Sequence, residues 1–142
     1  MPMQSPRWTS ITASQFEWER RALDFIQNGL PDHDPYRAWS NFEFQTQDGA
    51  IYEVDCLVLT KQGFWLVECK AWEGLIQGDS GTWTIRGNNH TKAVDNPVLL
   101  ANRKAKALSS ILKSQKAMKG LKLPWLDPLV FLSADNLQCE LS

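Results

Sequence analysis

The sequence predicts a single α/β domain in which helices flank a mixed β-sheet. A helical pattern covers residues 12–32, three strand-like segments follow between residues 40 and 72, and a second helical pattern precedes an apolar run at 128–133. The predicted order is therefore α-β-β-β-α-β. A chain of 142 residues is long enough to bury one hydrophobic core.

Both helices have recognisable starts. Thr12 or Ser14 can cap the first helix with its hydroxyl oxygen, since such side chains accept hydrogen bonds from free backbone N–H groups. Asp95 or Asn96 can cap the second, because Pro97 follows at the position where a helix tolerates proline best.

One acidic residue of the first helix lies on its apolar stripe. Phe16, Leu23 and Ile26 form the stripe, and Glu19 falls between the first two. Glu17 belongs to the opposite, polar face. A carboxylate on the inward side is either at the margin of the core or needed inside it.

The strands are separated by turn signals. Asp-Gly at 48–49 favours a tight hairpin turn. The apolar run at 128–133 is typical of a strand in the buried interior of a sheet. The predicted strands are residues 40–47, 50–60 and 64–72, with a further short strand or hairpin within 81–89.

The second helix combines an apolar face with basic residues. Residues 1–96 carry a net charge of −5 and residues 97–142 a net charge of +4. This asymmetry indicates one region that binds cations and another that meets polyanions, although a solvated basic face explains the second region equally well. The predicted apolar face is Val98, Ala101, Ala105, Leu108 and Leu112, and the candidate phosphate contacts are Arg103, Lys104, Lys106 and Lys113.

The second and third strands form a hairpin that brings carboxylates together. A four-residue loop at 60–63 pairs Leu59 with Phe64. Counting back along both strands places Asp55 opposite Glu68 on one face. Two like charges at this distance destabilise a hairpin unless one is protonated or a cation lies between them.

Metal-assisted chemistry is one explanation of these charges. Carboxylate oxygens suit Mg²⁺ or Mn²⁺, and Lys70, two residues after Glu68, can orient a water or stabilise developing negative charge. The alternative is an ion pair in which Lys70 neutralises Glu68 or Glu53.

The remaining composition favours a cytoplasmic protein. No apolar run approaches the roughly 18 residues of a membrane span, and no secretory signal precedes the domain. Cys56, Cys69 and Cys139 lack the spacing of zinc ligands, and the first two alternate with core residues, as small buried hydrophobes do.

The hairpin motif occurs in a specific context. Asp, about a dozen residues, then Glu-x-Lys is followed by G-x-I-x-G at 74–78, a tryptophan and then Asn-Pro at 96–97. From about residue 14 to about residue 133, this order resembles the NERD (nuclease-related) domain of the PD-(D/E)xK nuclease superfamily. The resemblance implies a restriction-endonuclease-like core and Mg²⁺-dependent cleavage of DNA.

The resemblance also implies roles for single residues. Asp55 and Glu68 correspond to metal ligands, Lys70 to the catalytic lysine, and Glu19 to the family's first-helix glutamate, which would complete the metal and catalytic set. One departure concerns a Gln that many NERD domains carry four residues after the Asn of Asn-Pro. Here that position is Leu100.

The segment at 18–44 further resembles NERD modules at the N-terminus of large kinase-like proteins of the PglW type, found in phage defence. That resemblance implies that residues 1–142 are one domain of a larger protein, with DNA, a C-terminal kinase-like domain or other defence proteins as partners and no membrane. Two alternatives stay open: a DNA-binding module that does not cleave, and an interaction or homodimerisation module.

Overall fold

The computed structural model describes residues 7–87 and 89–142. Residues 1–6 and Asn88, which belongs to the segment predicted as a hairpin, lie outside the described residues. The elements are β1 (Trp8–Ser10), α1 (Glu17–Gly29), β2 (Arg37–Gln45), β3 (Ile51–Leu59), β4 (Phe64–Lys70), β5 (Gly74–Gly78), β6 (Thr82–Arg86), β7 (Thr91–Asp95), α2 (Pro97–Lys113), a 3-10 turn (Lys116–Met118), β8 (Leu126–Leu132) and β9 (Leu137–Leu141).

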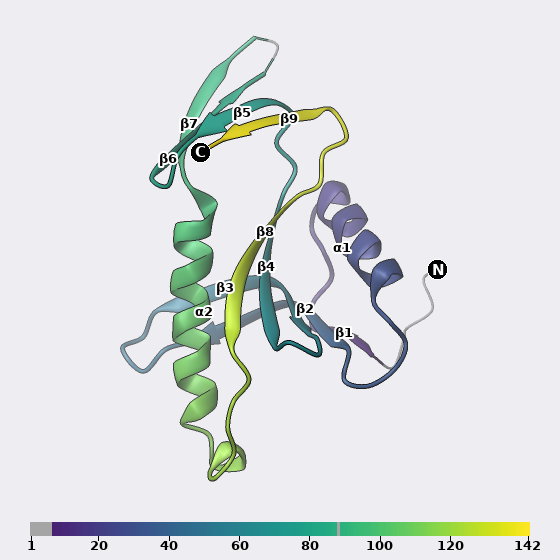
Figure 1. Cartoon of the computed structure of the whole chain (residues 1–142), viewed down its shortest axis with the longest axis vertical. Helices are drawn as coiled ribbons and strands as arrows, with labels where there is room; N and C mark the ends of the chain where they lie inside the picture. The colour runs from purple at the N-terminus through teal and green to yellow at the C-terminus, as the bar shows by residue number, and fades with distance from the viewer. Residues whose placement is uncertain (1–6, 88) are drawn as a thin grey trace.

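The strands form two mixed sheets, which confirms the α/β class. The larger sheet has the order β1-β2-β3-β4-β8, and the smaller one has the order β7-β6-β5-β9. Figure 1 shows the smaller sheet across one end of the molecule, beyond the end of β4. The sequence predicted only a short strand or hairpin there, and it did not predict β9, which pairs in parallel with β5 from far along the chain.

The two helices cover opposite faces of the larger sheet, on either side of β4 and β8 in Figure 1. One core cluster joins Ala22 and Leu23 of α1 to Cys56 and Val67 of the sheet. A second cluster joins α2 to the other face through Ala101, Ala105, Leu108, Leu57 and Leu66. Within the described residues, neither helix has the length and hydropathy that a membrane crossing requires.

The start of α2 follows the prediction. The Asn96 side chain accepts a hydrogen bond from the Val98 N–H at 2.9 Å, with Pro97 as the first helical residue. The Asn96 amide also donates to the Asp79 carbonyl at 3.1 Å, which ties the helix start to the β5–β6 turn.

The start of α1 differs from the prediction. The helix begins at Glu17, with Phe16 as an N-cap that supplies no side-chain hydrogen bond. Ser14 instead accepts a hydrogen bond from the Asn41 amide at 2.9 Å, and the Thr12 hydroxyl donates to the Asn41 carbonyl at 2.7 Å. Both hydroxyls therefore fix the segment before α1 to β2.

Two predictions of burial were wrong. Strand β8 lies at the edge of its sheet, pairing only with β4 among the described strands. Its apolar run has another cause: α2 packs along it, and Phe131 contacts Phe25 of α1 with ring centroids 5.6 Å apart. Val98, predicted on the apolar face of α2, is exposed, whereas Pro97 beside it and Ala101 one turn later are buried.

Candidate active site

The β3–β4 hairpin has the predicted loop and register. The Thr60 N–H donates to the Gly63 carbonyl at 2.8 Å, and Leu59 pairs with Phe64. The ladder ends at Cys56 and Val67, one pair before Asp55 and Glu68. The predicted opposition of these two carboxylates is therefore not formed as a ladder pair.

Asp55 fills the gap in the ladder with its side chain. Its Oδ2 accepts a hydrogen bond from the backbone N–H of Cys69 at 2.8 Å. On the other side of β3, Asn41 has a left-handed backbone with φ of 56° and interrupts the β2 ladder opposite Asp55. Asp55 thus lies where both neighbouring ladders open, and its carboxylate is held in the opening.

The strand alternation changes phase at this point. Cys56 packs in the cluster with α1, whereas Val54, two residues away, packs in the cluster with α2. Residues two apart in a regular strand point to the same side. The same change occurs in β2, where Trp39 and Phe42 both pack against the cluster with α2 although they are three residues apart. The change turns the Asp55 side chain away from the face that it was predicted to share with Glu68.

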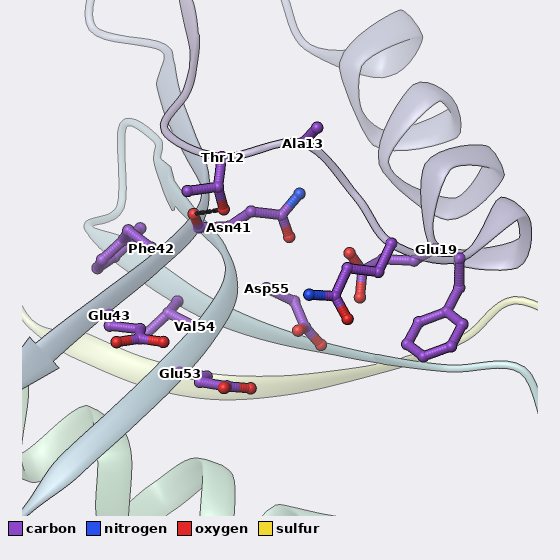
Figure 2. A pocket seen from close by; sticks show the side chains of 11 residues that line it. Thr12, Ala13, Glu19, Asn41, Phe42, Glu43, Glu53, Val54 and Asp55 are labelled. Carbon is purple, nitrogen blue, oxygen red and sulfur yellow. Dashed lines mark hydrogen bonds between the residues drawn. The ribbon is translucent and has the colours of Figure 1, made fainter.

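The side chains of Asp55 and Glu53 line a pocket of about 420 Å³ between β2, β3 and the start of α1. Glu19 lines the same pocket from α1, and Glu43 lines it from β2. In Figure 2 the carboxylates of Glu19 and Asp55 point toward one another, whereas those of Glu43 and Glu53 lie farther along the pocket. This is a concave acidic site built from three elements.

Glu19 and Glu17 lie where the helical pattern predicts. Glu19 is half-buried in the pocket, whereas Glu17 is exposed and pairs with Arg20 at 2.5 Å and Arg21 at 3.7 Å. The part that Glu19 plays in metal binding or catalysis stays a prediction.

Three carboxylates of the site resist ionisation. Burial and then the neighbouring Asp55 carboxylate raise the pKa of Glu19 and of Glu68. Burial also raises the pKa of Asp55, against the opposing effects of the Cys69 N–H and the Lys104 ammonium. A divalent cation would favour the ionised forms, because opposite charge offsets both burial and mutual repulsion.

Glu68 has a partner that the sequence did not predict. Its Oε1 accepts a hydrogen bond from the Nζ of Lys104 at 2.8 Å, and the same Nζ donates to the Glu53 carbonyl at 2.6 Å. Glu68 is 6% exposed and Lys104 is 8% exposed. Glu68 therefore contacts α2, whereas Asp55 lines the pocket next to α1, and the two carboxylates lie within electrostatic range of one another.

Lys70 is not the neutralising cation that the ion-pair alternative required. It forms no salt bridge among the described residues, and its Nζ lies 5.5 Å from the ring centroid of Trp72. The ammonium still lowers the pKa of Asp55 and of Glu68, so it lies within electrostatic range of both. Lys104 takes the place in the ion pair that the sequence suggested for Lys70.

The predicted phosphate contacts divide into two groups. Arg103, Lys106 and Lys113 are exposed along α2. Lys104 is not on this surface, because its side chain is buried against Glu68, so its expected place among the exposed bases of α2 is wrong. Leu100, at the family's Gln position, is 43% exposed.

Two features were not predicted, the burial of Lys104 and the phase change at Asn41, although the sequence contained a signal for each. Lys104 lies three residues after Ala101 and four before Leu108, which places it on the inward face of its helix, as Glu19 is on α1. The phase change at Asn41 is visible in the odd spacing of Trp39 and Phe42, and Asn is among the few residues that tolerate a left-handed backbone.

The donor set matches a hard divalent cation in chemistry. No group of three or more His, Cys, Asp or Glu side chains within the described residues is arranged to hold a metal ion. Mg²⁺ commonly uses one or two protein carboxylates and keeps several waters, so a closed cage is not required. Asp55, with Glu19 beside it and Glu68 within electrostatic range, meets that requirement in ligand type.

The fold and the site together define a nuclease-like α/β domain with an acidic pocket. The family model described as "NERD: Nuclease-related domain" matches residues 14–133, and the chain belongs to this family. It is 42% identical to the "Probable kinase PglW" of Streptomyces coelicolor, over 98% of this chain and 9% of that protein's length. The chain therefore spans about a tenth of that relative. The comparison with solved structures found no match.

Proposed function

We propose that this domain hydrolyses DNA phosphodiester bonds with Mg²⁺ or Mn²⁺ as cofactor. The observation that carries the proposal is the convergence of Glu19 and Asp55 in a pocket of about 420 Å³, beside the strand that carries Glu68 and Lys70. The NERD family is nuclease-related, which agrees with this chemistry.

Each residue has a role that its position supports. Asp55, Glu19 and the free oxygen of Glu68 would hold the cation, and the Cys69 N–H keeps the Asp55 carboxylate in place. A bound divalent cation would supply Lewis-acid stabilisation of the negative charge that develops on the phosphate. Lys70 would leave the Trp72 ring when substrate arrives and orient a water or stabilise that charge.

The exposed bases of α2 would hold the DNA backbone. Arg103, Lys106 and Lys113 are free of salt bridges within the described residues. Changing Lys106 and Lys113 to Gln should weaken binding to all duplex sequences. It should also reduce the log-log salt slope by roughly 0.9 for each phosphate that the protein no longer neutralises. An unchanged slope would assign this surface to solvent.

Cleavage tests the proposal. Plasmid, linear and single-stranded DNA are incubated with the protein in Mg²⁺, Mn²⁺ or EDTA, beside Asp55→Ala, Lys70→Met and the control Glu17→Gln. Cleavage should require a divalent ion and should be abolished in the first two variants only. Cleavage that persists in Asp55→Ala would come from a contaminating nuclease or another site.

Two observations favour a second candidate, a DNA-binding module that does not cleave. Leu100 replaces a polar residue of the family, and Lys70 rests on Trp72 rather than beside a carboxylate. Such a module would bind DNA with the same salt dependence and leave it intact under every metal condition.

The similarity to a kinase suggests the setting of this activity. We place the domain in a larger defence-associated protein, where it would act next to a kinase-like domain. Deleting the domain from such a protein should leave phosphoryl transfer intact and remove nuclease activity.

A further inference from the structure

Lys104 is a buried cation that reaches the β3–β4 hairpin from α2, within electrostatic range of Asp55. It reaches Glu68 from α2, with two of its three N–H donors directed at Glu68 Oε1 and the Glu53 carbonyl. Lysine is seldom buried unless it is paired. The pair therefore accounts for the burial of Lys104, and the Lys104 ammonium opposes the effect of burial, which raises the pKa of Glu68.

The pair leaves one oxygen of Glu68 available. Lys104 contacts Oε1, and Oε2 has no hydrogen-bond donor among the described residues. Among the described residues, no fully buried side-chain oxygen lacks a hydrogen-bond partner. Because Oε2 has no such partner, it is not fully buried and retains contact with solvent. Glu68 can thus bind a cation through Oε2 while Lys104 holds Oε1.

We propose that Lys104 is a positioning residue that acts as an internal cation, competing with the divalent metal for the charge of Glu68 and thereby setting the affinity of the site. The inference rests on the proposed metal site, and it adds a residue outside the ligand set. This role of Lys104 explains how the fold tolerates the absence of metal. The Lys104 ammonium supplies at Glu68 the positive charge that the metal would otherwise bring.

Two effects of Lys104 on the metal oppose each other. Its ammonium repels a nearby divalent cation, which weakens binding. Its hydrogen bond also fixes the Glu68 carboxylate, which strengthens binding. Glu68 is already restrained by burial and by pairing of its strand with β8, so the second effect is the smaller. Removal of the charge should therefore tighten metal binding.

The test is the affinity for Mn²⁺ alone, measured by calorimetry and by the thermal shift between EDTA and Mn²⁺. Lys104→Met should bind Mn²⁺ at least tenfold more tightly than the parent chain, a difference of about 1.4 kcal/mol. It should be less stable than the parent in EDTA and gain more from the metal. Lys106→Met removes the same charge from an exposed position of α2 and should change neither quantity.

A further variant isolates the pair. In Lys104→Met with Glu68→Gln, the charge for which the cations compete is absent, so the gain in affinity should disappear. If Lys104→Met does not fold in EDTA, its folding on addition of Mn²⁺ supports the proposal, and Lys104→Gln, which retains amide donors, supplies the affinity.

The outcomes separate this inference from the proposed function. Metal binding by the parent chain with equal or weaker binding by both Lys104 variants overturns the inference and leaves the nuclease proposal in place. Binding only by the variants supports the competition. Absence of binding in all of them overturns both.

Discussion

Asp55 gives opposite predictions for two substitutions at one position. Asp55→Asn keeps an oxygen for the Cys69 N–H and removes a negative charge that burial disfavours. In EDTA at pH 7 this variant should be more stable than the parent chain by about 0.5–2 kcal/mol, as is common when a functional charge is removed. Its new amide donor also faces the Glu19 carboxylate across the pocket.

Asp55→Ala removes the same charge but leaves the Cys69 N–H without an acceptor in a residue that is 1% exposed. An unsatisfied buried donor costs about 1–3 kcal/mol. The Ala variant should therefore unfold about 4–12 °C below the Asn variant, at about 4 °C per kcal/mol for a domain of this size.

The assay is urea and thermal unfolding in EDTA, followed by circular dichroism. Asp127→Asn is the control, because it removes an exposed strand carboxylate on β8. Equal stability of the Asn and Ala variants would refute the role assigned to the hydrogen bond. An Asn variant less stable than the parent chain would refute the claim that the site is held ready for a cation at the expense of stability.

Three further predictions concern pH, packing and capping. Folding raises the pKa of Asp55, so the stability that this group contributes is fully present below its ordinary pKa of 3.8 and is lost as pH rises through the raised value. The stability advantage of Asp55→Asn over the parent chain in EDTA should therefore grow with pH. An advantage that does not depend on pH would contradict this. Leu66 is 0% exposed between the sheet and α2, so Leu66→Ala should cost about 2–5 kcal/mol in chemical unfolding, and a loss below about 1 kcal/mol would show that the core collapses around it. Asn96→Ala removes the cap of α2 and should cost about 1 kcal/mol, whereas Asn96→Ser should retain most of the stability.

Local signals predicted the parts of the fold that depend on neighbouring residues. Asn96 and Pro97 start a helix because a side-chain acceptor and a residue without an N–H suit its first turn. The loop at Thr60–Gly63 fixes the register of the hairpin by its length alone. The helical pattern likewise predicted the inward position of Glu19, which lines the pocket.

Other parts depend on contacts between distant segments. The smaller sheet is completed by β9, whose five residues carry too short a pattern to identify their partner β5. The opposition of Asp55 and Glu68 was predicted from regular alternation, and the irregular backbone at Asn41 cancels that regularity. Lys104 was predicted to lie on the surface because it is charged, although its position in the helix is on the inward face. Its partner on β4 is 36 residues away in sequence.

The binding of divalent ions to the parent chain tests the account most directly. Calorimetry with Mn²⁺ and Mg²⁺ at neutral pH should show saturable binding in the millimolar range or tighter. Asp55→Asn should remove most of that binding, and Glu17→Gln, an exposed carboxylate on the other side of α1, should retain it. Absence of binding by the parent chain at millimolar ion concentrations, or equal binding by Asp55→Asn, would contradict the assignment of the acidic pocket as a metal-dependent active site.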